Sequence, residues 1–378
     1  MSAVRLGPVV LERRALPSRL TMVGVRALAV VTALLFGAVI LAVTGYSATE
    51  SYRTMWYGTF GGGTNGIAET LVAATPLILT GLAVAVAARM LLWNIGAEGQ
   101  LFLGATFASA LALSFAGWPR PLLLTGMVLA GVVGGAAWAL GPALLRARFG
   151  VNEIITTLML NYVAILLVDY LVHGRWRDPG SSGFPLSKPF GESATLPLIL
   201  AETRLHAGFL IALAAAGALW VMLRNTRFGY EVRAIGESPA AARYAGMPTG
   251  RNIVLVMLLS GALAGLAGMG EVSGIVHRIQ PDISVAYGYT GILVAALARF
   301  SPPGVVLVGI LFGALQVGGF ALQTAGAPAS IVGILMGSIL FVAIGAEFLA
   351  RFRVGWNRSP EELAADEQRA IAHEVEAR

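Results

Sequence analysis

Polar side chains stand at a few positions inside the long apolar runs of this 378-residue chain, 57% of which is apolar. Asn94, Glu98 and Gln100 occur close together, and Gly96 and Gly99 between them interrupt a helix. In an apolar surrounding, a broken helix frees backbone groups that only a cavity or a neighbouring segment can satisfy, and such breaks often line a passage. The spacing of these residues favours the interpretation that they line a transport passage. The alternative is a tight turn at a membrane surface with Glu98 near water.

Further polar residues could contribute to the same lining. Thr157 and Asn161 are four residues apart and share one helix face, where polar groups either join helices or line a pore. Asn152 comes just before that helix and is expected to cap it. Tyr287 and Tyr289 could stack on a planar ligand, although tyrosines near a membrane surface usually serve as anchors. The predicted pathway residues are Asn94, Glu98, Gln100, Thr157, Asn161, Tyr287 and Tyr289.

The chain carries no pattern for hydrolytic or covalent chemistry of its own. A phosphate-binding loop requires Gly-Lys-Ser/Thr, but the one lysine, Lys188, lies between Ser187 and Pro189. There are no cysteines, and the four histidines are far apart, without the spacing of metal ligands. A Gly-x-Ser-x-Gly nucleophile motif is missing as well. We therefore expect no enzyme activity, no metal and no cofactor in this chain, so any ATP is hydrolysed on another polypeptide.

The elements that must position the polar residues are membrane-spanning helices. Only 12% of the residues are charged, against about 25% in soluble domains. A helix crosses the bilayer with about 20 apolar residues. This composition predicts an all-α polytopic membrane protein, and the third and eighth crossings are short and interrupted by glycine. The ten predicted crossings lie at about 25–46, 67–89, 98–117, 121–145, 152–172, 205–223, 252–275, 285–300, 303–322 and 328–350.

Glycine is abundant, at 47 residues. Two glycines four positions apart lie on one helix face and let a second helix backbone approach closely. Such pairs also arise by chance in a glycine-rich chain, so we expect only some of them to be true contacts. The pairs inside predicted crossings are Gly131/Gly135, Gly261/Gly265, Gly309/Gly313 and Gly333/Gly337.

The distribution of arginine predicts the orientation of the crossings. Alternate pairing places both termini and four loops on one side of the membrane, and that side carries most of the 26 lysines and arginines. By the positive-inside rule this side is cytoplasmic. The four loops are 89–97, 146–151, 224–251 and 300–302. The predicted organisation is a transmembrane domain at 1–356, with a cytoplasmic segment at 1–24 and an external loop at 173–204, followed by a polar cytoplasmic tail at 357–378.

The longest loop on the arginine-rich side, 224–251, contains a short helix with defined ends. Ser238 suits the cap, and Pro239 suits the first helical position. Residues 240–245 favour a helix, and Gly246 ends it. A rigid helix with one small face suits a mechanical contact with a partner, whereas the plain alternative is a surface linker. The residues expected at that contact are Glu237, Ser238, Pro239, Ala241, Ala242, Arg243, Tyr244 and Gly246.

Three segments together resemble a known family. They read NIGAEGQ at 94–100, VNEIITTLMLNY at 151–162 and GESPAAARYAG at 236–246. These segments are similar to the membrane-spanning permeases of ABC importers, in the branch that includes nucleoside, simple-sugar and branched-chain amino-acid permeases. The first segment is most like the nucleoside type. The resemblance extends from about residue 20 to residue 350.

The resemblance implies about ten helices in two pseudo-related halves, with broken helices near the pathway and a short cytoplasmic coupling helix. It implies a bacterial inner membrane and three partners: an ABC ATPase subunit that binds ATP and Mg, a second permease subunit, identical or different, and an extracytoplasmic substrate-binding lipoprotein. Nucleic acid is not among the partners. The implied substrate is a nucleoside or a related purine or pyrimidine compound, with a simple sugar as the runner-up.

Two alternatives from other classes stay open at this point. An ion-coupled secondary transporter working alone needs ion sites in the membrane, and Glu98, Asp169 and Glu271 are the acidic candidates. An oligomeric channel would give passive flux without saturation.

Overall fold

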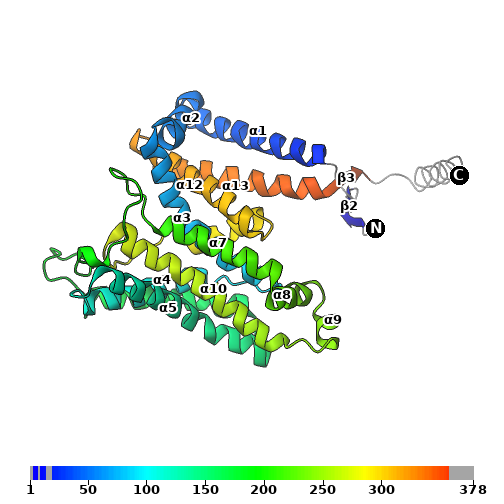
Figure 1. Ribbon diagram of the computed structural model, residues 1–378. Helices are drawn as coiled ribbons and strands as arrows, with labels where there is room; N and C mark the ends of the chain where they lie inside the picture. The colour runs from blue at the N-terminus through cyan, green and yellow to red at the C-terminus, as the bar shows by residue number, and fades with distance from the viewer. Residues whose placement is uncertain (1–2, 7–8, 14–18, 357–378) are drawn as a thin grey trace, which may run out of the picture. The chain divides into compact units, whose positions relative to one another are not determined.

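The computed structural model describes residues 3–6, 9–13 and 19–356 (Figure 1). Within these ranges the chain forms thirteen α-helices and is helical over most of its length. The predicted helical fold is therefore confirmed in its main feature. The polar tail predicted at 357–378 lies outside the described residues.

Each of the ten predicted crossings contains a helix. Their bounds are α1 Arg19–Val43, α3 Thr64–Ala88, α4 Ala97–Ser114, α5 Arg120–Phe149, α6 Glu153–His173, α7 Gly208–Asn225, α10 Thr249–Glu271, α11 Tyr287–Leu297, α12 Pro302–Thr324 and α13 Ala329–Arg351. Six helices among the described residues are long and apolar enough to cross a membrane, namely α3, α5, α6, α7, α10 with the turn after it, and α12. Since α11 has only 11 residues, it is too short to cross a bilayer alone. The number of ten crossings stays a prediction.

Short elements connect the long helices. The sequence predicted one of them, the helix α9 at Pro239–Tyr244, and the structure confirms it as a helix. The other short elements are α2 Ala48–Trp56, the π-helical turn η1 Tyr57–Gly61, the 3-10 turn η2 Glu192–Ala194, α8 Arg227–Glu237 and the π-helical turn η3 Val272–Val276.

A small antiparallel sheet accompanies the thirteen helices, and the sequence did not predict it. Its strands are β1 Ala3–Leu6, β2 Val9–Arg13 and β3 Phe352–Trp356, in the order β1-β2-β3. In β3, large apolar residues alternate with Arg353 and Gly355, which is the period of a strand. Because this five-residue pattern directly follows a long apolar helix, a search for long apolar segments does not detect the strand.

The chain divides into two compact units. Among the described residues, one unit holds those up to residue 49 together with 328–356, and the other holds residues 50–327. In the first unit α1 and α13 pack against each other (Figure 1). The second unit contains α3–α12 and every residue of the predicted pathway and coupling sites.

Glycine contacts hold the centre of the second unit together, where α10 packs along α5 and α4 (Figure 1). A Cβ atom on Gly135 would lie 2.1 Å from the Gly261 carbonyl oxygen, and one on Gly265 would lie 2.2 Å from the Gly131 oxygen. The backbones of α5 and α10 thus touch, because neither helix carries a side chain there. Two of the predicted glycine pairs therefore pack against each other.

The remaining two glycine pairs behave differently from each other. Gly313 on α12 packs so closely on α3 that an added Cβ would lie 2.6 Å from the Thr70 carbonyl oxygen, and Gly309 lies against Ile78. Within the described part of the chain, Gly333 and Gly337 on α13 have no atom near the place of a Cβ. The spacing alone did not distinguish these cases.

Candidate functional site

The chain leaves the helical conformation between α3 and α4, at residues 89–96; we call this stretch the broken segment. Asn94 and Gln100 are both 1% exposed and pair through their amides. Asn94 Nδ2 donates to Gln100 Oε1 at 2.8 Å, and Gln100 Nε2 donates to Asn94 Oδ1 at 3.1 Å. Asn94 Nδ2 also donates to Ser260 Oγ on α10 at 2.7 Å, and Ser260 Oγ donates to the Ala83 carbonyl on α3 at 2.6 Å. The broken segment is thereby tied to two long helices.

Asn161 on α6 holds the same segment from another side. Its Oδ1 accepts from the Gly99 N–H at 2.9 Å, and its Nδ2 donates to the Ile95 carbonyl at 2.9 Å and to the Tyr289 hydroxyl at 3.0 Å. Thr157 is 1% exposed and Asn161 is fully buried, so the predicted shared face is confirmed. In this conformation Asn161 joins helices, which is one of the two roles that the sequence left open.

Glu98 lies where two helices begin. It stands in the first turn of α4 and is 3% exposed, and its Oε2 accepts from the Gly288 N–H of α11 at 2.6 Å. A carboxylate at a helix N-terminus is favoured by the helix dipole, and here it faces two N-termini. Glu98 is not near water in this structure, so the alternative of a wetted surface turn is wrong for this residue.

The two predicted tyrosines lie inside the helix bundle. Tyr287 is 9% exposed, and its carbonyl accepts from Thr80 Oγ1 on α3 at 3.0 Å. Tyr289 is half-buried and bonded to Asn161. A membrane-surface anchor would expose its ring at the lipid boundary, which Tyr287 does not do. The structure thus brings all seven predicted pathway residues together around the first turns of α4 and α11.

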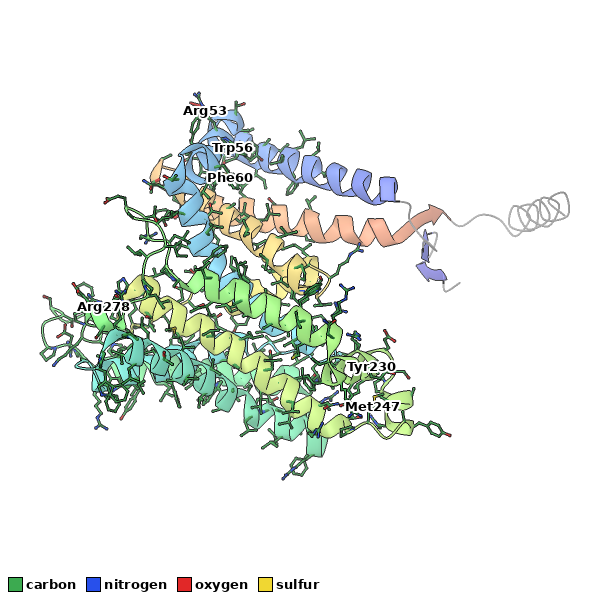
Figure 2. All side chains as sticks on the ribbon, viewed as in Figure 1. Arg53, Trp56, Phe60, Tyr230, Met247 and Arg278 are labelled. Atoms are coloured by element: carbon green, nitrogen blue, oxygen red, sulfur yellow. The ribbon has the colours of Figure 1, made fainter. Side chains whose placement is uncertain are left out.

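The loop 224–251 lies at one end of the same unit. Figure 2 shows Tyr230 on α8 and Met247, which follows α9, at the opposite end of α10 from Arg278. Ser238 Oγ accepts from the Ala241 N–H at 3.3 Å, and Gly246 has a φ of +74°. The predicted cap and stop of α9 are therefore confirmed as structure. Tyr244 is 97% exposed, and among the predicted contact residues Ala242 is buried.

The sequence missed α8 and read its residues as a loop. The Thr226 side chain caps this helix by accepting from the Gly229 N–H at 3.0 Å, and Val232 and Ile235 are buried on one face. Glu231 Oε2 accepts from Asn252 Nδ2 on α10 at 2.7 Å. A threonine cap before an apolar pair at three-residue spacing was the signal that could have found it.

The opposite end of the unit is held by polar contacts. Arg204 Nε donates to Glu69 Oε1 at 2.9 Å, which joins the loop before α7 to α3. The loop also bonds to η3, where Ser273 Oγ donates to the Ala194 carbonyl at 2.6 Å. His206 is 1% exposed, and burial lowers its pKa to about 4, with His277 nearby adding to the effect. The segment before α7 is therefore packed against the helices and held by hydrogen bonds.

Long apolar helices around a buried polar centre define a multi-pass membrane protein. The family model for the permease component of branched-chain amino acid transport systems matches residues 66–344. The chain belongs to this family of ABC importer permeases. As a permease component it is a transport subunit and not an enzyme, as predicted, and membership implies an ATPase and a binding protein as partners.

Similar proteins are found in archaea and bacteria. The chain is 39% identical to the glucose ABC transporter permease protein TsgB13 of Haloferax volcanii, over 94% of this chain and 96% of that protein. It is 35% identical to the guanosine ABC transporter permease protein NupP of Bacillus subtilis, over 89% and 97%. It is 33% identical to the nucleoside ABC transporter permease protein NupB of Lactococcus lactis, over 83% and 88%.

Proposed function

We propose that this chain is the subunit through which an ATP-driven importer moves a nucleoside, or a related purine or pyrimidine compound, into the cytoplasm. The observation that carries the transport role is the meeting of two helix starts, α4 and α11, at Glu98 within the bundle. Discontinuous helices of this kind form substrate sites in transporters. The nucleoside class is supported by two of the relatives above, whose names specify guanosine and nucleoside.

The proposed pathway runs past the buried polar residues around the broken segment. In the present conformation their hydrogen bonds are made to one another and to the backbone, for example between Asn94 and Gln100. During import the same groups exchange these partners for the hydroxyl and base groups of the substrate. Tyr289 and Asn161 are hydrogen-bonded to each other. In this proposal the Tyr289 ring stacks on the base of the substrate, and the Asn161 amide forms hydrogen bonds with it.

The proposed coupling contact is α9, which binds in a groove of the ATPase subunit. Its exposed residues include small alanines and the long side chains of Arg243 and Tyr244. ATP and Mg bind to that partner and not to this chain. The complete importer contains a second permease subunit and an extracytoplasmic lipoprotein, and both termini of this chain are cytoplasmic in a bacterial inner membrane.

Co-expression with the cognate ATPase tests the coupling contact. Arg243→Glu and deletion of 238–246 are expected to abolish the complex on co-purification, because they reverse the charge or remove the contact. Arg148→Glu is the matched control, since Arg148 is also an exposed arginine at the cytoplasmic end of a helix. Intact assembly and full transport in both α9 variants would refute the assignment.

A simple sugar is the second candidate substrate, because the relative named as a glucose permease is 39% identical. Both candidates carry a ring with hydroxyl groups, so the discriminating group is the base. Uptake of labelled guanosine by the reconstituted importer, with unlabelled glucose as competitor, separates them. Guanosine uptake that glucose does not reduce supports the nucleoside, and glucose uptake without guanosine uptake supports the sugar.

An ion-coupled transporter makes the opposite prediction about energy. The purified chain alone, in liposomes with an ion gradient, would then accumulate substrate without any ATPase. We expect no accumulation under these conditions and full accumulation when ATPase and ATP are added.

A further inference from the structure

The end of α8 rests directly on the end of α3. A Cβ atom on Gly236, in the last turn of α8, would lie 1.9 Å from the Arg89 carbonyl oxygen and 3.0 Å from the Arg89 carbonyl carbon. Real Cβ atoms do not come this close to backbone, so any larger residue displaces one helix from the other. Arg89 is the first residue after α3 and begins the broken segment. We call this contact the 89–236 joint.

The joint is continuous with the coupling helix. Ser238 ends α8, where its N–H donates to the Ala234 carbonyl at 3.0 Å, and the same residue caps α9. One residue thus separates the two helices, which leaves little freedom between them. Glu231 ties α8 to Asn252 at the start of α10. A displacement of α9 is therefore transmitted to Gly236 through a rigid connection between the two helices.

The Arg89 side chain extends the contact to a second turn. Its Nε donates to the Phe300 carbonyl at 3.0 Å, in the turn between α11 and α12. Arg299 and Phe300 both have a positive φ, of +53° and +54°, which is costly for residues other than glycine. The Phe300 ring also meets the Trp93 ring edge-on, with centroids 6.4 Å apart. The Arg89 side chain thus connects the strained turn after α11 to the start of the broken segment.

The broken segment then leads into the buried polar centre. The Trp93 N–H donates to Glu153 Oε1 at 3.2 Å, and Glu153 forms an ion pair with Arg146 at 3.2 Å. The next residue, Asn94, is bonded to Ser260 and Gln100. Arg89 therefore contacts the far ends of both interrupted regions: it begins the segment that leads to α4, and it bonds to the turn that ends α11.

We propose that Arg89 and Gly236 are positioning residues that transmit the movement of α9 to the broken segment and to α11, so that ATPase closure rearranges the groups around Glu98. This inference rests on the proposed contact between α9 and the ATPase. It assigns to the 89–236 joint a role separate from docking, because neither residue belongs to the exposed surface of α9.

The test separates transmission from docking. In the reconstituted importer, Gly236→Ala and Arg89→Ala are expected to co-purify with the ATPase in normal amounts and to keep basal ATP hydrolysis. Substrate transport per ATP hydrolysed is expected to fall about ten-fold, within the range of measured coupling energies. Gly250→Ala is the matched glycine control, because its Cβ would meet only the Ala147 oxygen at 3.8 Å. Arg148→Ala is the control for loss of a cytoplasmic arginine.

Two further measurements keep the test decisive if a variant folds poorly. Arg89→Lys retains the charge and a donor, and is expected to transport at a rate between those of wild type and Arg89→Ala. Hydrogen exchange of residues 89–96 is expected to change when the ATPase binds nucleotide, in wild type and in Gly250→Ala but not in Gly236→Ala. Transport per ATP equal to wild type in both joint variants would overturn the proposal, as would loss of assembly by either one. Intact assembly and full transport in both Arg243→Glu and the 238–246 deletion would instead overturn the docking assignment.

Discussion

At the scale of single residues, the polar groups predicted from the sequence are buried and bonded. Asn161 shows why, since its amide satisfies the Gly99 N–H and the Ile95 carbonyl, two backbone groups that the broken helix leaves free. The Asn161 side chain thus satisfies the backbone groups that are left free where Gly96 and Gly99 interrupt the helix. The sequence identified Asn161 and the two glycines and could not tell that they meet.

Replacing Asn161 by alanine should destabilise the protein. The Gly99 N–H and the Ile95 carbonyl would be left buried without this partner, at a cost of about 1–3 kcal/mol. Thermal unfolding of the purified chain in detergent measures the change, and uptake should fall with it. Thr156→Val is the control, because the Thr156 hydroxyl bonds only within α6 and to its cap residue. An Asn161→Ala variant as stable as wild type would contradict the structural role.

His206 should make the loop before α7 sensitive to acid. Its pKa falls from 6.5 to about 4 on folding because the ring is buried. The unfolded chain therefore takes up a proton below about pH 6.5 that the folded chain does not. The free energy of unfolding is therefore unaffected by His206 above about pH 6.5. It decreases progressively as the pH falls to about 4, by at most about 3 kcal/mol.

Hydrogen exchange of residues 190–210 between pH 7.5 and pH 4.5, corrected for intrinsic rates, checks this prediction. His206→Gln should remove most of the pH dependence, while His173→Gln should not, since His173 is exposed. Equal slopes in wild type and His206→Gln would exclude His206 as the cause.

At the scale of elements, close backbone contact decides which helices pack. The α5–α10 interface depends on glycines that face glycines, and this match let the sequence suggest contact positions without naming the partner helix. One helix break, the one between α3 and α4, was predicted from glycines next to polar residues. The helix α8 was missed because its apolar face is only two residues wide.

Gly135→Ala should destabilise the protein, and Gly141→Ala on the same helix should not. A Cβ on Gly135 meets backbone at 2.1 Å, whereas Gly141 has no atom within 4 Å of that place. Overpacking of this kind costs about 1–3 kcal/mol, while alanine in a free helix position stabilises by up to about 1 kcal/mol. Melting temperatures of the two variants in detergent measure the difference. Equal melting temperatures would mean that α5 and α10 are not in backbone contact.

At the scale of the whole molecule, the arrangement places α9 and the segment after α10 at opposite ends of one unit (Figure 2). Together with the arginine distribution, this arrangement predicts that Tyr244 faces the cytoplasm and Asp282 the exterior. Because the chain has no cysteine, each position can be tested with one introduced thiol.

A membrane-impermeant thiol reagent should label Asp282→Cys in intact cells. It should label Tyr244→Cys only after the membrane is opened, since Tyr244 is exposed but lies on the other side. Labelling of both positions in intact cells, or the reverse order, would exclude the predicted orientation and with it the contact between α9 and a cytoplasmic ATPase.

The sequence by itself determined the membrane class, the ten helical segments and the capped helix at 239–244, and it singled out polar residues that proved to be buried, because apolar length, caps and helix breaks are local signals. Only the tertiary structure showed that α4 and α11 begin at the same carboxylate and that Gly236 rests on Arg89. Those contacts join residues 190 and 147 positions apart, and no local pattern encodes which distant backbone will lie within reach.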